Sequence, residues 1–222
     1  MPLLHDRYPC VASCVLMMAG HKKAGRLLLG LVVWIGLGVP ACRRWLEADM
    51  ALHMLVQLPL LAWVGWQLGQ ALPGKVSRCL APWNFQGISG LLLASLMMTV
   101  WMLPVALDAA INQPLGILAK FLGVPLLLGL PCALSWPQAG FIVRGVFLVE
   151  WIATLFRTGW LYLAAPVRLC TSYLLDAQQI TGQGLLAGAS LILVLLVLRL
   201  IAGPLRTPTG SGTRAGLVRR EP

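Results

Sequence analysis

Charged residues are scarce in this sequence, and their scarcity argues against a water-soluble domain. Only 11% of the 222 residues are charged, whereas a soluble domain carries about a quarter. With 59% hydrophobic residues and a mean hydropathy of +0.82, the chain lacks the polar side chains needed to cover a surface in water. We therefore expect an all-α polytopic protein, a bundle of spanning helices embedded in a lipid bilayer.

Acidic residues are scarcer than basic residues. Seven of them face 17 lysines and arginines, which gives a net charge of +10. In a soluble protein this excess would indicate nucleic-acid binding. Here the basic residues flank apolar runs rather than forming one face, so we expect them to hold loops on the cytoplasmic side of a membrane. No nucleic-acid partner is predicted.

Motifs of catalysis are also missing. The chain has three histidines and contains no H-E-x-x-H sequence, no phosphate-binding glycine loop and no G-x-S-x-G turn. We therefore expect no enzyme activity. None of the six cysteines forms a zinc-type C-x-x-C pair. Cys42 and Cys170 could form a disulfide if both face an oxidising compartment, and free thiols are the alternative.

Six apolar runs predict about six spanning helices, since one crossing needs roughly 20 residues. The runs cover residues 25–42, 51–72, 87–107, 115–135, 139–165 and 185–202. The first is also open to interpretation as a signal peptide that starts at Met18 and is cleaved near residues 38–41. We favour a helix because Arg43 and Arg44 follow it directly. Three prolines within the runs predict kinks, namely Pro104, Pro125 and Pro131.

The distribution of basic residues predicts the orientation. They gather in residues 1–24, after the second run, and in residues 204–222, and these segments share one side if six helices cross the membrane. The positive-inside rule then places both termini in the cytoplasm of a bacterial inner membrane. We divide the chain into a basic amino-terminal segment (1–24), a transmembrane bundle (25–203) and a disordered basic cytoplasmic tail (204–222).

Soft metal ligands gather near the outer face of the predicted bundle. His53 and Gln57 lie one turn apart where the second helix begins. Met98 and Met102 lie towards the outer end of the third helix, which Asp108 follows. Imidazole and thioether groups together suit Cu(I). The alternative for the methionines is apolar packing, and for His53 a hydrogen bond at the interface.

Two ionisable residues fall within the fifth run. Glu150 and Arg157 are seven residues apart, so they share a helix face but lie about 10 Å apart along its axis. We expect no direct ion pair between them without a bridging group. Glu150 is either a relay carboxylate or, like Arg157, a polar anchor between helices. Lys120, near an outer helix end, is expected to extend its amine to the interface.

Four short segments resemble those of CtaG-type cytochrome c oxidase assembly factors. Residues 52–61 resemble the family's HMxxHLLL segment, 100–110 its WHxPxLYDAA segment, 149–160 its EH…FW helix, and 176–182 its DQQLGG segment with one residue inserted. Their order is that of the family. Of the family's histidines the chain keeps His53, while Gln57, Met102 and Trp151 stand at the other three positions. Family members tend to have seven spans.

The resemblance implies an inner-membrane protein that assists assembly of a haem–copper oxidase, through copper supply to its subunits or to another periplasm-facing copper protein. Two alternatives follow. A rebuilt site would bind Cu(I) through His53, Met98 and Met102. The supporting residues of that site would be Gln57, Asp108, Glu150, Asp176, Gln178 and Gln179, the last three in a loop before the sixth helix. Otherwise the chain is a metal-free protein that stabilises a partner complex.

Overall fold

The computed structural model describes residues 9–73 and 79–202, and within these ranges the chain is helical without a strand. The first half contains α1 (Pro9–Gly38), α2 (Pro40–Glu47), α3 (Met50–Leu52), a π-helical turn η1 (His53–Gln57), α4 (Leu58–Ala71), the short 3-10 turns η2 (Ala81–Trp83) and η3 (Phe85–Gly87), and α6 (Ile88–Trp101). The second half contains α7 (Pro104–Asn112), α8 (Pro114–Gly123), a π-helical stretch η4 (Val124–Gly129), α9 (Leu130–Ser135), α10 (Phe141–Ala164) and α11 (Leu175–Ala202).

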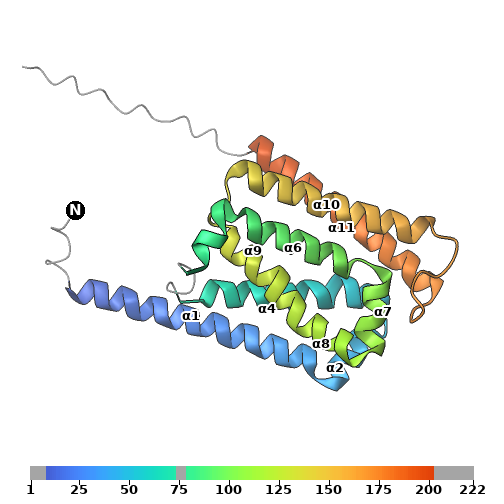
Figure 1. Ribbon diagram of the computed structural model, residues 1–222, viewed down its shortest axis with the longest axis horizontal. Helices are drawn as coiled ribbons and strands as arrows, with labels where there is room; N and C mark the ends of the chain where they lie inside the picture. The colour runs from blue at the N-terminus through green and yellow to red at the C-terminus, as the bar shows by residue number, and fades with distance from the viewer. Residues whose placement is uncertain (1–8, 74–78, 203–222) are drawn as a thin grey trace, which may run out of the picture.

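The long segments lie side by side and alternate in direction (Figure 1). α1, α6 and α10 run one way, and α4, α8–α9 and α11 run the other. The start of α1 and the end of α11 therefore share one end of the bundle, which we call the terminal end. The opposite end, which we call the α7 end, contains α2, α7, the start of α8 and the connection 165–174 between α10 and α11.

Several helices are long and apolar enough to cross a membrane. Three such segments are Met50–Ala71, Pro114–Ser135 and Leu175–Ala202. Two bent pairs, Lys23–Gly38 with Pro40–Glu47 and Phe85–Trp101 with Pro104–Asn112, raise the number to five if each pair is one span. The chain is thus a helical protein with three to five candidate spans. α10 has 24 residues but is not among them, and it carries Arg144, Glu150 and Arg157.

Of the three kinks predicted at prolines, only the one at Pro104 is a sharp bend, because Pro125 and Pro131 lie within the continuous segment Pro114–Ser135. Pro104 begins α7 after Leu103 in an extended conformation, and the chain turns there by 75°. Around Pro125 the helix does not break but widens into the π-helical stretch η4. Proline has no amide hydrogen to donate to the carbonyl one turn earlier in the helix, so the local hydrogen bonding must rearrange.

Two helices extend further than the hydrophobic runs suggest. α11 begins at Leu175 rather than near residue 185, so Asp176, Gln178 and Gln179 lie in its first turns and not in a loop. An aspartate is stabilising there because it faces the positive end of the helix dipole. α1 begins at Pro9, within the segment expected to precede the bundle. The tail 204–222 lies outside the described residues.

Close backbone contacts hold α4 against η4. A Cβ atom on Gly65 would overlap the backbone of Pro125, and one on Gly129 would overlap the carbonyl of Ala62. Small residues of this kind let membrane helices approach each other where no hydrophobic effect drives them together. α11, in contrast, leaves much of its apolar surface exposed, as expected for a helix in contact with lipid.

Candidate functional site

A buried polar cluster lies near the α7 end of the bundle. It contains Glu47 from α2, His53 and Gln57 from η1, Lys120 from α8 and Tyr173 from the connection 165–174. His53, Gln57 and Lys120 have no exposed surface. α2 and η1 are close in sequence, whereas α8 and the connection 165–174 reach them from 63 to 126 residues away, and all four meet through hydrogen bonds rather than through apolar packing alone.

Lys120 is the centre of this cluster. Its Nζ lies 2.5 Å from Glu47 Oε1, 3.2 Å from His53 Nε2 and 3.2 Å from Gln57 Oε1. An ammonium group has three hydrogens to donate, so these three acceptors use all of them. The prediction that Lys120 extends its amine to the interface was therefore wrong, because partners on α2 and η1 solvate the charge inside the protein.

The hydrogen bonds of Lys120 also fix the form of His53. Since an ammonium group accepts no hydrogen bond, Nε2 must be the acceptor, and we infer that Nδ1 carries the proton. Nδ1 then donates to the Tyr173 hydroxyl at 2.9 Å, and that hydroxyl donates to the Glu47 carbonyl at 3.0 Å. Burial, together with the Glu47 carboxylate, raises the pKa of Tyr173, so the phenol keeps the hydrogen that it donates.

Local structure around η1 positions these groups. Asp49 caps the short helix before it, accepting hydrogen bonds from the amides of Ala51 at 2.7 Å and Leu52 at 3.3 Å. The π-helical turn then carries both His53 and Gln57 to the interior. π-helical turns are rare in proteins overall, and many of those that occur lie at functional sites. The amide nitrogen of Gln57 is buried and has no hydrogen-bond partner among the described residues.

The predicted copper ligands divide between two places. Met98 and Met102 line a cavity of about 330 Å³ together with Met54, whereas His53 is not part of that lining. Both ring nitrogens of His53 lie within hydrogen-bond distance of protein partners. In the part of the chain that the structure describes, no three histidine, cysteine, aspartate or glutamate side chains are placed to hold a metal ion.

Asp108 and Gln178 hold the connection between α10 and α11. The Asp108 carboxylate accepts hydrogen bonds from the Thr171 amide at 2.9 Å, the Thr171 hydroxyl at 3.1 Å and the Ser172 amide at 3.2 Å. Gln178 accepts from the Leu169 amide at 2.9 Å and donates to a backbone carbonyl of α10 at 3.1 Å. These contacts position the segment that carries Tyr173. Asp176 and Gln179, also expected at the site, are exposed.

Cys42 and Cys170 are both free thiols, so the disulfide considered from the sequence is not formed. The Cys170 thiol is buried, with its Sγ 3.8 Å from the carbonyl oxygen of Pro104. Burial raises its pKa to about 11, and the nearby Asp108 carboxylate contributes to the rise. Cys170 is therefore protonated at neutral pH and weakly nucleophilic.

A second ion pair lies midway along α10. Arg157 donates to Glu150 Oε1 at 2.5 Å and to the Thr154 hydroxyl at 3.1 Å. The expectation of no direct pair was wrong, because side chains lean toward the amino end of a helix and arginine is long enough to reach back two turns. The side chains are 65% exposed for Arg157 and 44% exposed for Glu150. They line a groove of about 400 Å³ that Met102 and Thr158 share.

Sequence reasoning missed two members of the buried cluster. Glu47 follows an apolar run and lies close to Arg43 and Arg44. At such a position the sequence suggests a loop carboxylate that offsets the charge of the arginines. Tyr173 lies in a connection without periodicity, and its 120-residue separation from His53 leaves no local signal. The seven-residue spacing of Glu150 and Arg157 placed both on one helix face, but it led to the wrong expectation that they form no direct pair.

Comparisons with protein-family models, with curated proteins and with solved structures gave no match. The geometry therefore carries the functional argument. Residues 52–61, 100–110, 149–160 and 176–182 come together in the fold. Each contributes to a single apolar cluster, through Met54 from the first, Met102 and Leu107 from the second, Ile152 and Leu155 from the third, and Ala177 from the fourth.

Proposed function

We propose that this protein is a six-span membrane accessory protein that stabilises a partner complex, with a respiratory haem–copper oxidase of a bacterial inner membrane as that partner. The observation that carries the proposal is the exposed ion pair Glu150–Arg157 midway along α10. Ionisable residues inside a membrane nearly always face a bundle interior or a water-filled cavity, because lipid does not solvate them. Here they face outward, which favours cover by another protein.

The buried cluster supports an accessory role over catalysis. All three Lys120 hydrogens and both His53 nitrogens are engaged within the protein. A nucleophile or general base needs a free lone pair directed at a substrate. A network of this kind acts instead as a connection between α2, η1, α8 and the α10–α11 connection, and it keeps the α7 end of the bundle rigid.

The charge distribution supports six spans with the terminal end in the cytoplasm. Described cations belong to both halves of the bundle: Lys23, Arg26, Arg144 and Arg199 to the terminal half, and Arg43, Arg44, Lys120 and Arg168 to the α7 half. The carboxylates Glu47, Asp49, Asp108 and Asp176 all belong to the α7 half, and the arginines of residues 204–222, which follow α11 in the sequence, supply the basic excess of the terminal side. Cytoplasmic loops carry the excess of lysine and arginine. The sixth span would be α10, whose ion pair Glu150–Arg157 the proposed partner covers.

The oxidase is chosen as partner because of the CtaG-like segments. These segments are far apart in sequence and contribute to one apolar cluster, which is what a shared ancestral core would produce. That cluster includes Met102, which also lines the groove beside Glu150 and Arg157. Glu150 and Arg157 themselves lie in residues 149–160, the third of these segments, so the proposed contact surface is part of the resembling region.

Co-purification tests both parts of the proposal. A tagged protein is isolated from its native membranes in mild detergent, and oxidase in the eluate is measured from reduced-minus-oxidised haem spectra. We expect haem with the parent and a loss of most of it with the Glu150→Leu/Arg157→Leu variant. Arg199→Leu, which removes an exposed cation from α11, is the matched control. Parent eluates without oxidase haem contradict the partner class, and equal haem in all three contradicts the contact surface.

Copper handling is a second candidate, favoured by three thioethers on one cavity. Met54, Met98 and Met102 line the same space, and thioethers suit Cu(I). Anaerobic loading with Cu(I) should then give about one copper per chain, lost when all three methionines are replaced by leucine, which keeps their volume. His53→Gln should leave the copper content unchanged. Parent protein without copper, or copper that depends on His53, contradicts this methionine site.

A further inference from the structure

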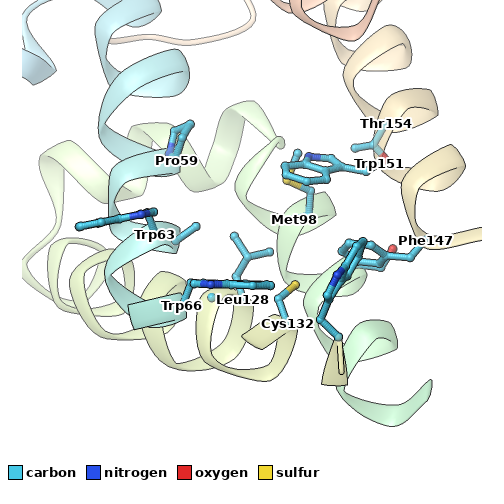
Figure 2. A pocket seen from close by; sticks show the side chains of 13 residues that line it. Pro59, Trp63, Trp66, Met98, Leu128, Cys132, Phe147, Trp151 and Thr154 are labelled. Carbon is cyan, nitrogen blue, oxygen red and sulfur yellow. The ribbon is translucent and has the colours of Figure 1, made fainter. Parts of the chain in front are cut away.

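A cavity of about 280 Å³ lies between α4, η4–α9, α6 and α10, next to the methionine-lined cavity, with which it shares Pro59, Met98, Leu128 and Trp151. Figure 2 shows Trp63 and Trp66 on one side of it and Trp151 and Phe147 on the other. Met98, Leu128 and Cys132 lie between them. None of the residues that line this cavity is charged. Its size is near the lower end of the range for ligand pockets, roughly 300 Å³.

The aromatic side chains form a continuous wall rather than separate contacts. Trp66 meets Trp136 with ring centroids 6.4 Å apart, Trp136 meets Phe147 at 6.4 Å, and Phe147 meets Trp151 at 6.1 Å. Tilted and edge-on arrangements at these distances are favourable. The wall is therefore held in place by its own contacts, which keeps the space beside it open.

A cation lies beside this wall toward the terminal end. The Arg144 guanidinium is 5.5 Å from the centroid of the Trp136 ring, and its Nε donates to the Trp136 carbonyl at 3.0 Å. It forms no ion pair within the described ranges of the chain. Arg144 lies in the first turn of α10, one turn before Phe147, which lines the cavity.

We infer that this cavity binds one acyl chain of an anionic glycerophospholipid whose phosphate pairs with Arg144. The uncharged aromatic walls suit a hydrocarbon chain. The terminal amino groups of the guanidinium form no hydrogen bond with another residue that the structure describes, and arginine binds phosphate through such groups in a bidentate manner. Basic sites between membrane helices bind anionic head groups in this way on the cytoplasmic side. The inference is independent of the partner complex proposed above.

A compact polar ligand fits this cavity less well. The polar side chains of the lining are hydroxyls, a thiol and indole nitrogens, and one of the hydroxyls, that of Thr154, is already bonded to Glu150. A buried polar head would remain largely unpaired, which costs free energy. With a lipid, the charged part stays at the membrane surface beside Arg144, and only the chain enters.

Quenching of tryptophan fluorescence by brominated lipids tests the site, because tryptophans form its walls. The full chain, with exposed Trp45, Trp83 and Trp160 replaced by phenylalanine to lower the background, is placed in phosphatidylcholine nanodiscs. Phosphatidylglycerol or phosphatidylcholine brominated in the acyl chain is then titrated in. We expect the anionic lipid to be favoured about fivefold, the effect of one basic residue at a membrane surface.

Two variants and a control decide the outcome. Arg144→Gln should abolish the preference for phosphatidylglycerol, whereas Arg199→Gln, which removes an exposed cation from α11, should keep it. Ser95→Leu adds volume to the lining and should remove the saturable quenching for both lipids, which gives an arm independent of Arg144. Equal quenching by both lipids in the parent overturns the inference, as does a preference that survives Arg144→Gln or quenching that survives Ser95→Leu.

Discussion

Two ion pairs in this protein have the same separation and opposite surroundings. Lys120 and Glu47 lie 2.5 Å apart, as do Arg157 and Glu150. Lys120 is completely buried and its amine has three acceptors, while the Arg157 side chain is 65% exposed. The first pair joins α8 to α2, and the second joins two residues of α10. Distance alone therefore says little about what either pair does.

The comparison teaches that the surroundings determine which partners are needed. A buried ion pair gains little net free energy over an apolar pair, but removal of one member leaves an uncompensated charge in the interior. An exposed pair in water contributes about 0–1 kcal/mol. An exposed pair on a membrane helix is different, because lipid does not solvate it as water does. The first pair is complete within the chain, whereas the proposed function has another protein cover the second.

The largest effect is expected from Lys120→Met. This change leaves the Glu47 carboxylate without its closest partner and removes the donor from His53 Nε2 and Gln57 Oε1. We expect a loss of about 3–5 kcal/mol in the free energy of unfolding. The measurement is unfolding in mixed micelles with increasing dodecyl sulfate, followed by tryptophan fluorescence.

The matched variant Glu47→Leu/Lys120→Met removes both charges and should recover most of that loss, because an apolar pair of similar volume often replaces a buried ion pair without cost. Arg43, which is 3.6 Å from Glu47 and partly exposed, can turn to water. If the double variant is as unstable as Lys120→Met, the cost comes from lost packing or from the lost hydrogen bonds to His53 and Gln57, and not from an unpaired charge.

An intermediate effect is expected from Tyr173→Phe. The ring remains, but His53 Nδ1 loses its acceptor and the Glu47 carbonyl loses its donor. A buried polar group without a partner costs about 1–3 kcal/mol. The same micelle titration should show this loss, and Tyr162→Phe serves as the comparison because its hydroxyl makes one weaker contact, 3.4 Å from the Met102 carbonyl. Equal losses in both variants would contradict a special role for Tyr173.

A small effect on stability is expected from Arg157→Gln in the isolated protein. Its side chain is largely exposed, and in the detergent-solubilised protein water reaches both charges. We expect a change of at most about 1 kcal/mol. The same variant should lose most of the partner that copurifies with the parent. A large loss of stability without loss of partner would make this pair a structural element like that of Lys120.

Much of the fold could be predicted from the hydrophobic runs and the prolines of the sequence, but the ends of the helices could not. The bend before Pro104 follows from the missing amide hydrogen of proline. The early start of α11 could not be read from hydropathy, because Gln178 and Thr181 are polar yet buried. The side-chain amide of Gln178 accepts a hydrogen bond from the Leu169 backbone amide and donates one to the Tyr162 carbonyl. Both are tertiary contacts. Hydropathy assigns such a turn to a loop.

The candidate site was predictable only where its members share an element. His53 and Gln57 are separated by one turn, and the sequence predicted that they share one helix face, but it assigned them to a copper site and not to this polar cluster. Lys120 was assigned to the interface because a lone lysine near a helix end usually extends to water, and its acceptors come from elements 63 to 73 residues away. Pairing over such distances depends on helix packing, which the spacing of residues along one chain does not contain.

The smallest effect is expected at Cys170, where a change of pH should alter the rate of thiol alkylation and leave the fold unchanged. Its thiol is buried at the α7 end, and its pKa is raised to about 11. Because the thiolate is the reactive form, its alkylation rate should rise about tenfold for each pH unit from pH 7 to pH 10. The measurement is iodoacetamide labelling of a variant that keeps only this cysteine, with exposed Cys79 retained alone as the comparison. A rate for Cys170 that levels off below pH 9 would mean that water reaches the thiol, and that the α7 end is less closed than the buried ion pair implies.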